Sequence, residues 1–466
     1  MTATTTVKMK KTSDFGSGPV LGTLFRLSLP AIGMMFLNTL VFLVDSIFVS
    51  WLGEAQIAAM SLSLAVSMIF QALMEGVGNG TTALVGQNLG RDNARQARLL
   101  AISGLTLAYA VAAMAVVLFF RPAAGFLLGK LGAMNDPAVL EAAYLYNFWL
   151  PLTLPFIAYT YICNCVFRCQ GDTVRPLIAM SISNIVNAIL DPIFIFTLGW
   201  GIEGAAVATI IGRICAAVYL YRMMKTRSAL LVPPFPIPRK IFFKNWLRIA
   251  LIGLPVALST GTAAAGFGWL NRILSSFGNY AMAALMMSLR IEDFSFTVII
   301  GVCSALTPFL AFNYGRRDLP RMLAGIRASV IISGGIMLLI GSLIFVFPHP
   351  FIRLFRPSAE AASLTVLAIR LAISSYPFII VQFILNSYFV ATGYSTFGTI
   401  AQLVRSIFVR IPAAYFFASL WGDRGIWLFQ PTSWLFGAIV AGVFAIYLTR
   451  RIRAAFLLEE MKAAEG

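Results

Sequence analysis

Long apolar stretches alternate with short polar segments along the whole chain. Most stretches exceed the ~20 residues that an α-helix needs to cross the hydrocarbon core of a bilayer, so we expect tilted or bent helices. The pattern predicts an all-α integral membrane protein with 12 transmembrane helices. They cover residues 24–52, 55–85, 99–120, 142–167, 175–198, 201–223, 246–275, 280–312, 322–347, 362–390, 396–420 and 425–448.

Composition supports a membrane protein. Hydrophobic residues make up 59% of the 466 residues and charged residues only 11%, whereas soluble domains contain about 25% charged residues. Residues 1–17 are polar and lack the apolar core of a cleaved signal peptide. We therefore expect a multi-pass protein whose main partner is the lipid bilayer.

The distribution of charge predicts the orientation. Most of the 35 Lys and Arg residues fall in segments that are cytoplasmic if the N-terminus lies inside, such as 8–11, 222–248 and 450–453. This positive-inside bias predicts a plasma-membrane (inner-membrane) protein with both termini in the cytoplasm. It also accounts for the net charge of +17 without a nucleic-acid partner.

The two halves of the chain repeat each other. Constant offsets superpose Leu29-Pro30 on Leu254-Pro255, QNLGRD on FNYGRRD, Gly171 on Gly393, and GIEG on GDRG. Each half holds six spans, an even number, so the halves share one orientation, as in transporters built from parallel repeats. We predict an N-terminal lobe over 1–223, a proline-rich cytoplasmic linker over 224–244 and a C-terminal lobe over 245–466.

One predicted span carries an acid. Asn184, Asn187 and Asp191 follow one another at i, i+3 and i+7, which places them on one face of a helix, and Pro192 comes next. A charge at membrane depth costs roughly 2.5–3.5 kcal/mol even on lenient insertion scales, so such residues are candidates for function.

A second acid is expected to lie near the first. Counted from the outer ends of their spans, Asp45, Asp191 and Thr209 all lie roughly 10–12 Å below the outer surface, with Asn187 one turn deeper. Two carboxylates in a low-dielectric site cannot both ionise cheaply, so one is expected to hold a proton. The same oxygen atoms would equally suit a bare cation. The equivalent positions of the second half hold Leu270 and Ile411.

The C-terminal half has charges of its own in predicted spans. An internal ion-pair network would neutralise them, and the alternative is a role in coupling or substrate recognition. The sequence leaves both readings open. The residues are Arg290, Glu292, Asp293, Arg405 and Arg410.

Two other features of the sequence are explained by packing alone. The glycines of 76–80 predict close helix packing. The five cysteines are small apolar core residues, and His349 is the single histidine, so we predict neither a metal site nor a cofactor.

Four stretches resemble one transporter family. They are LSLPAIGMMFLNTLVFLVDSIFVSWLG, the RCQGDTVRP turn, NIVNAILDPIFIF, and the run from Gly301 to Gly315. Together with the repeat they are similar to the MATE (multidrug and toxic compound extrusion) family, above all its DinF-like and archaeal branch.

The resemblance implies two six-helix bundles around a central cavity and efflux of amphipathic, mainly cationic compounds in exchange for H⁺ or Na⁺. The family's coupling cluster corresponds to four residues of this chain, and the bending proline of the first helix corresponds to Pro30. We assign three asparagines to the substrate cavity. The coupling residues are Asp45, Asn187, Asp191 and Thr209, and the cavity residues are Asn38, Asn164 and Asn184.

Other functions are less well supported. No G-x4-GK[ST] sequence is present for an ATP-driven pump, and no HExxH for a metalloprotease. We therefore expect a monomeric secondary transporter for small molecules, not an enzyme. The alternative is a flippase for a lipid-linked precursor from the same superfamily.

Overall fold

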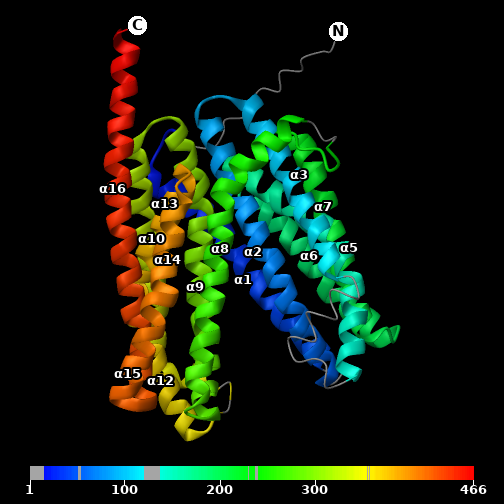
Figure 1. Ribbon diagram of the computed structural model, residues 1–466. Helices are drawn as coiled ribbons and strands as arrows, with labels where there is room; N and C mark the ends of the chain where they lie inside the picture. Colours follow the sequence, from blue (N-terminus) through cyan, green and yellow to red (C-terminus); the bar gives the residue numbers. More distant parts are fainter. Residues whose placement is uncertain are drawn as a thin grey trace. The chain divides into compact units, whose positions relative to one another are not determined.

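The computed structural model describes residues 15–50, 54–119, 137–228, 230–236, 240–353, 355 and 357–465, for some of them only the backbone. Within these ranges every regular element is a helix or a helical turn (Figure 1). The α-helices are α1 (Val20–Ser50), α2 (Glu54–Gly90), α3 (Ala94–Phe119), α5 (Pro137–Cys169), α6 (Val174–Pro192), α7 (Gly201–Arg227), α8 (Lys240–Ser275), α9 (Asn279–Gly315), α10 (Leu319–Val346), α11 (Pro348–Arg353), α12 (Ala359–Ser374), α13 (Tyr376–Thr392), α14 (Ser395–Leu403), α15 (Arg410–Gly425) and α16 (Phe429–Glu465). Two π-helical turns are η2 (Ile193–Thr197) and η3 (Val404–Val409), and η4 (Ile426–Leu428) is a 3-10 turn.

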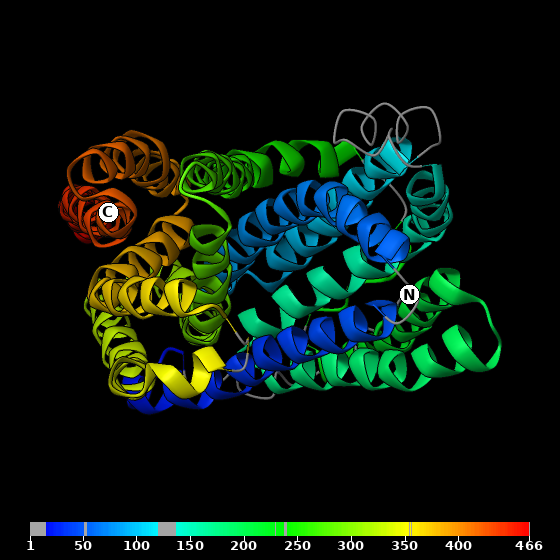
Figure 2. The same ribbon diagram turned by 90° about the horizontal axis from the view of Figure 1, so that it is seen from below.

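The described helices are long and apolar enough for a membrane protein. Nine stretches of the described chain meet the length and hydropathy of a membrane span, or ten if one bent pair counts as a single span. The stretch Ser395–Lys462 reverses at Trp421 and Gly422, whose backbone is not helical, so that α15 lies beside α16 (Figure 1 and Figure 2). The prediction of an all-α, multi-pass membrane fold is confirmed.

One predicted span is broken in the middle. The stretch predicted over 362–390 consists of α12 and α13, which meet at Ser375 with a bend of 50°. Pro377 follows the bend, and because a proline has no backbone N–H it cannot continue the hydrogen bonds of the preceding helix.

The chain forms two compact units. The first contains Gly33–Leu254, and the second contains Gly16–Ile32 together with Pro255–Gly466. The start of α1 thus belongs to the second unit and the start of α8 to the first. Both changes of unit occur within three residues of a helix proline, Pro30 in α1 and Pro255 in α8.

The backbone of the turns confirms the internal repeat. Asp92 and Arg317, which the repeat places at equivalent positions, both have a positive φ (57° and 63°). The next N–H closes the turn on an asparagine carbonyl in both cases, from residue 93 to 88 and from 318 to 313, each at 2.9 Å. Gly171 and Gly393 are a second such pair, with φ of 75° and 87°. Equivalent positions therefore have the same rare conformation.

The segment between α7 and α8 packs onto the first unit. Leu230 and Val232 are buried. The carbonyl of Leu231 accepts from Nε of Arg98 at 2.9 Å, and that of Pro234 accepts from the hydroxyl of Tyr109 at 2.6 Å. The proline-rich stretch is thus held against α3 by its own carbonyl groups.

Glycines bring α2 and the start of α8 into backbone contact. A Cβ atom at Gly80 would clash with the backbone of Ile249, and one at Gly253 would clash with the backbone of Gly76. Small residues allow this approach of two helices in a membrane. The close packing predicted for residues 76–80 is confirmed.

Candidate functional site

Helix α6 has a polar buried face and an apolar exposed face. Asn184, Asn187 and Asp191 are 7%, 6% and 1% exposed, so the shared face predicted from their spacing is confirmed. The opposite face carries the exposed Ile185 and Ile189, and the exposed Ile193 of η2 follows them. In a bilayer this arrangement turns the apolar face to lipid and the polar face to the neighbouring helices.

Three of the predicted coupling residues contact one another. Nδ2 of Asn187 donates to Oδ1 of Asp191 at 3.1 Å and to Oγ1 of Thr209 at 3.3 Å. The hydroxyl of Thr209 donates to the carbonyl of Ala205, one turn earlier in α7, at 3.0 Å. The resulting cluster, named the Asp191 cluster below, offers carboxylate, amide and hydroxyl oxygens that suit a proton or a hard cation.

Close packing of α6 on α7 holds the Asp191 cluster together. A Cβ atom at Gly212 of α7 would lie 2.6 Å from the carbonyl oxygen of Ser183 in α6, and one at Gly204 would lie 2.7 Å from the backbone of Phe194 in η2, the turn that continues α6. The two helices can therefore approach at these points only because both residues are glycines. This approach brings Thr209 within reach of Asn187.

A π-helical turn follows the acid. Pro192 has no N–H, so it leaves the carbonyl one turn earlier without its usual helical donor. In the next turn the N–H of Leu198 donates to the carbonyl of Ile193 at 2.9 Å, which is the i to i+5 bond of a π-helix. Such turns are frequent at functional sites.

The other predicted residues of the first helix lie in α1. Pro30 is inside the helix, and Asn38 is exposed. The side chain of Asp45 lies outside the described residues, so its place beside Asp191 stays a prediction, as does the hinge role of Pro30.

The asparagines assigned to the substrate cavity lie on three helices. Asn38 is on α1, Asn164 on α5 and Asn184 on α6. Oδ1 of Asn164 and Nδ2 of Asn184 are buried, and neither has a hydrogen-bond partner among the described residues. Their assignment to one cavity stays a prediction.

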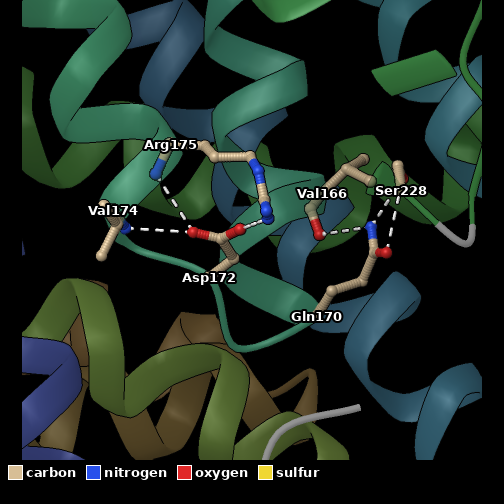
Figure 3. Close-up of polar contacts among 6 residues, drawn as sticks. All are labelled: Val166, Gln170, Asp172, Val174, Arg175 and Ser228. Carbon is tan, nitrogen blue, oxygen red and sulfur yellow. Dashed lines mark hydrogen bonds and ion pairs between the residues drawn. The ribbon is translucent and has the colours of Figure 1, made fainter. Parts of the chain in front are cut away.

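The turn before α6 fixes the base of this helix. Oδ1 of Asp172 accepts from the N–H groups of Val174 and Arg175, both at 3.1 Å, and the carboxylate pairs with the Arg175 side chain (Figure 3). The side chain of Gln170 donates to the carbonyl of Val166 at 3.2 Å and to the hydroxyl of Ser228 at 2.9 Å (Figure 3). The turn thus joins the ends of α5, α6 and α7.

We expect Asp172→Ala to destabilise the protein. The change removes the acceptor of two N–H groups at the start of α6, which typically costs about 0.5–2 kcal/mol. Asp172→Asn keeps an acceptor oxygen and loses only a partly exposed ion pair, so it should cost less. Thermal unfolding of the purified variants in detergent measures both effects. Equal stability of Asp172→Ala and wild type would contradict the capping role.

The structure separates the acids of the C-terminal half. Arg290 and Asp293 form an ion pair at 3.6 Å, with both side chains about half exposed. Glu292 is buried, and its Oε2 accepts from Nε2 of Gln430 at 2.7 Å. The charges that one of the two sequence-based interpretations places in a single network therefore have different neighbours.

The arginines of the C-terminal half are buried. Arg405 and Arg410 are each 3% exposed, and neither forms an ion pair within the part of the chain that the structure describes. Nε of Arg405 donates to Oε1 of Gln402 at 3.3 Å, and its guanidinium lies 3.7 Å from the ring centre of Trp434. Gln402 and Trp434 are not among the site residues predicted from the sequence. A signal was available for Gln402 alone, which lies three residues before Arg405 on the same span.

The family profile of MatE matches residues 30–193 and 255–416, one stretch in each half of the repeat and together well over half of the chain. The chain belongs to the MATE family. MATE proteins are secondary transporters, so the chain is a membrane transporter and not an enzyme. The predicted family is confirmed.

Curated relatives match over almost their whole length. An FAD transporter from Shewanella oneidensis is 27% identical over 461 residues, which cover 95% of this chain and 97% of that protein. The multidrug export protein MepA of Staphylococcus aureus is 25% identical over 441 residues, covering 94% and 95%. The relatives therefore include one protein named as an FAD transporter and one named as a multidrug export protein.

Solved MATE structures share the fold. The Vibrio cholerae transporter VcmN in its bent form has a TM-score of 0.87 at 23% identity, covering 93% of this chain and 98% of VcmN. An outward-facing multidrug resistance MATE transporter of the MOP superfamily has a TM-score of 0.84 at 25% identity, covering 94% and 97%.

Proposed function

We propose that this MATE protein exports amphipathic, mainly cationic compounds in exchange for H⁺ or Na⁺. The observation that carries the proposal is the Asp191 cluster, since a carboxylate only 1% exposed inside a membrane-spanning helix is costly unless it binds a counter-charge. Asn187 and Thr209 hold the carboxylate in place and add oxygen atoms for a bound ion.

The proposed coupling depends on the charge of Asp191. A proton or Na⁺ entering from outside neutralises the carboxylate, and a cationic substrate binds better to the protein while the carboxylate is charged. Each ligand therefore favours a different conformation, which is what antiport requires. Bending of α1 at Pro30 links neutralisation to the release of substrate, and VcmN was solved in a bent form.

The proposed placement follows the distribution of charge. The protein lies in the plasma membrane as a monomer with both termini in the cytoplasm, which puts the basic segments inside.

Transport into or out of proteoliposomes tests the function. Vesicles containing the purified protein are given a pH gradient or a Na⁺ gradient, and the movement of ethidium, an amphipathic cation, is followed by fluorescence. We expect one of the two gradients to drive ethidium transport well above the level of empty vesicles. Transport that needs neither gradient would contradict coupled antiport.

The same vesicles distinguish the other substrate classes. FAD is tested because the Shewanella relative carries that name and because Arg405 and Arg410 are buried cations. A fluorescent lipid-linked pyrophosphate tests the flippase alternative. Gradient-driven movement of this lipid in place of ethidium would replace drug export by the flippase function.

A further inference from the structure

The second unit contains buried positive charge that its own acids do not neutralise. Among the residues whose burial is described, the buried charged side chains of this unit are Glu292, Arg405 and Arg410. Glu292 is close enough to Arg410 to act on it electrostatically, yet the two form no ion-pair contact. If Glu292 balances one arginine, one buried positive charge remains.

The π-helical turn η3 brings both arginines to one side of the helix. The backbone N–H of Arg410 donates to the carbonyl of Arg405, which is an i to i+5 bond. With the wider π turn, residues five apart are separated by only about 50° around the helix axis, whereas an α-helix would separate them by about 140°. Helix α8 packs directly on this turn, since a Cβ atom at Gly266 would lie 2.6 Å from the carbonyl of Ser406.

Arg405 has polar and aromatic neighbours but an unused donor. Its Nε donates to Gln402, which also accepts from Nε2 of Gln382 at 3.3 Å. The guanidinium stacks on Trp434, while Nη1 is buried without a hydrogen-bond partner in the described chain. A cavity of about 40 Å³ lies beside these residues, lined by Gln382, Gln402, Trp434 and Phe383 among others. The cavity has room for a small polar group.

Arg410 has two unused donors. Its guanidinium lies 4.6 Å from the ring centre of Phe267 and 5.7 Å from that of Phe429. Nε and Nη1 are buried and have no hydrogen-bond partner within the described residues. Aromatic rings attract a cation that lies over their face. They provide no acceptor for the N–H groups that point outward in the plane of the guanidinium.

Buried guanidinium groups of this kind need acceptors for their N–H groups, and an oxyanion is the acceptor that also balances their charge. A desolvated N–H donor of a charged group without an acceptor destabilises the fold, and in native proteins such groups are almost always satisfied. A carboxylate or a phosphate provides two oxygen atoms with the geometry of the guanidinium fork. Neighbouring rings provide the apolar surface for the rest of such a ligand.

We propose that the second unit contains a binding site for the oxyanion group of an aromatic organic acid or phosphate ester. Arg405 and Arg410 bind the oxyanion, Gln402 orients the Arg405 side chain, and Trp434 with Phe383 contacts the aromatic part. The Asp191 cluster of the first unit and the arginines of the second lie on the fifth span of their respective halves, so equivalent spans carry opposite charge.

The site goes beyond the proposed export of cations, because it would admit an anionic substrate class, and its use in transport rests on the protein being a coupled exporter. Binding does not. Calorimetric titration of the purified full-length protein in a neutral detergent therefore tests the site without any ion gradient. The probes are phenyl phosphate and benzoate, with benzylamine as the cationic analogue and inorganic phosphate as the anion without a ring, at matched ionic strength.

We expect phenyl phosphate and benzoate to bind, and inorganic phosphate and benzylamine to bind at least about tenfold more weakly. Arg405→Gln and Arg410→Gln should each weaken phenyl phosphate binding roughly 10- to 100-fold, the effect of losing a hydrogen bond to a charged group. Arg405→Lys keeps the charge but not the fork, so its effect should be intermediate. Arg370→Gln, which removes an exposed arginine on α12, is the matched control and should bind like wild type.

If a variant fails to fold, thermal unfolding of the wild type with each ligand still tests the proposal. Phenyl phosphate should raise the wild-type unfolding temperature, and benzylamine should not. Equal binding of benzylamine, equal loss in Arg370→Gln, or the absence of stabilisation would exclude the site. Displacement of phenyl phosphate by low amounts of phosphatidylglycerol would assign the arginines to a lipid headgroup and overturn the aromatic substrate.

Discussion

Asp191→Asn should remove the ion dependence of transport while the protein keeps its fold. The asparagine has nearly the same shape, and its Oδ1 can still accept from Nδ2 of Asn187, which donates to Asp191 at 3.1 Å in the wild type. The side chain no longer carries a charge and no longer binds a proton. Gradient-driven ethidium transport should therefore fall by roughly 5- to 150-fold, the range that coupling free energies between two sites usually cover.

Two variants make this result specific. Thr209→Val removes a hydroxyl of the Asp191 cluster and should reduce coupling, whereas Thr209→Ser should keep it. Ser181→Ala lies on α6 outside the cluster, where the hydroxyl donates to the carbonyl of Leu177 at 3.0 Å, and should transport like wild type. Full gradient-dependent transport by Asp191→Asn would exclude Asp191 as the coupling residue.

Local rules predict much of the fold and part of the site. The spacing of Asn184, Asn187 and Asp191 is a property of one helix, so the sequence alone predicts their shared buried face. Offsets between turns predict the repeat, because Gly171 and Gly393 must both adopt a left-handed backbone. Such features depend on neighbours in the sequence, and for this reason they can be predicted without a structure.

Features that depend on distant contacts could not be predicted. The π-helical turn at Val404–Val409 has no proline within it, so nothing in its sequence predicts that Arg405 and Arg410 share one side. Whether these arginines form an ion pair depends on where Glu292 points, and this carboxylate accepts from Gln430 on α16, so the described residues contain no such pair. These arrangements depend on how the helices pack, and the hydropathy pattern of the sequence does not predict that packing.

Helices α1 and α8 each begin in one unit and continue in the other, and this arrangement also follows from packing. Proline removes one backbone hydrogen bond and weakens a helix locally. Pro30 and Pro255 are equivalent in the repeat, and each lies where the chain passes from one unit to the other. The repeat therefore gives both connecting helices the same weak point, which extends the expected hinge role of Pro30 to Pro255.

Gly212→Val should destabilise the first unit and disrupt coupling together. A Cβ atom at this position would lie 2.6 Å from the carbonyl oxygen of Ser183, a backbone atom that moves only if α6 moves. Overpacking of this kind costs about 1–3 kcal/mol. Moving α6 away from α7 also lengthens the 3.3 Å bond between Asn187 and Thr209. Thermal unfolding in detergent and ethidium transport in vesicles measure the two effects.

The size of the new side chain should determine the size of both effects. Gly212→Ala places a single methyl group against the carbonyl and should lie between wild type and Gly212→Val. Gly335→Val on α10 adds the same side chain where, among the described residues, the Cβ atom would meet nothing within 4 Å beyond the nearby backbone of its own helix, so stability and transport should stay near wild type. Two outcomes would show that contact between α6 and α7 does not maintain the Asp191 cluster. In the first, Gly212→Val unfolds at the wild-type temperature but loses coupling. In the second, it keeps coupling despite a lower unfolding temperature. A parallel loss of both, graded from alanine to valine, is the result that the close packing requires.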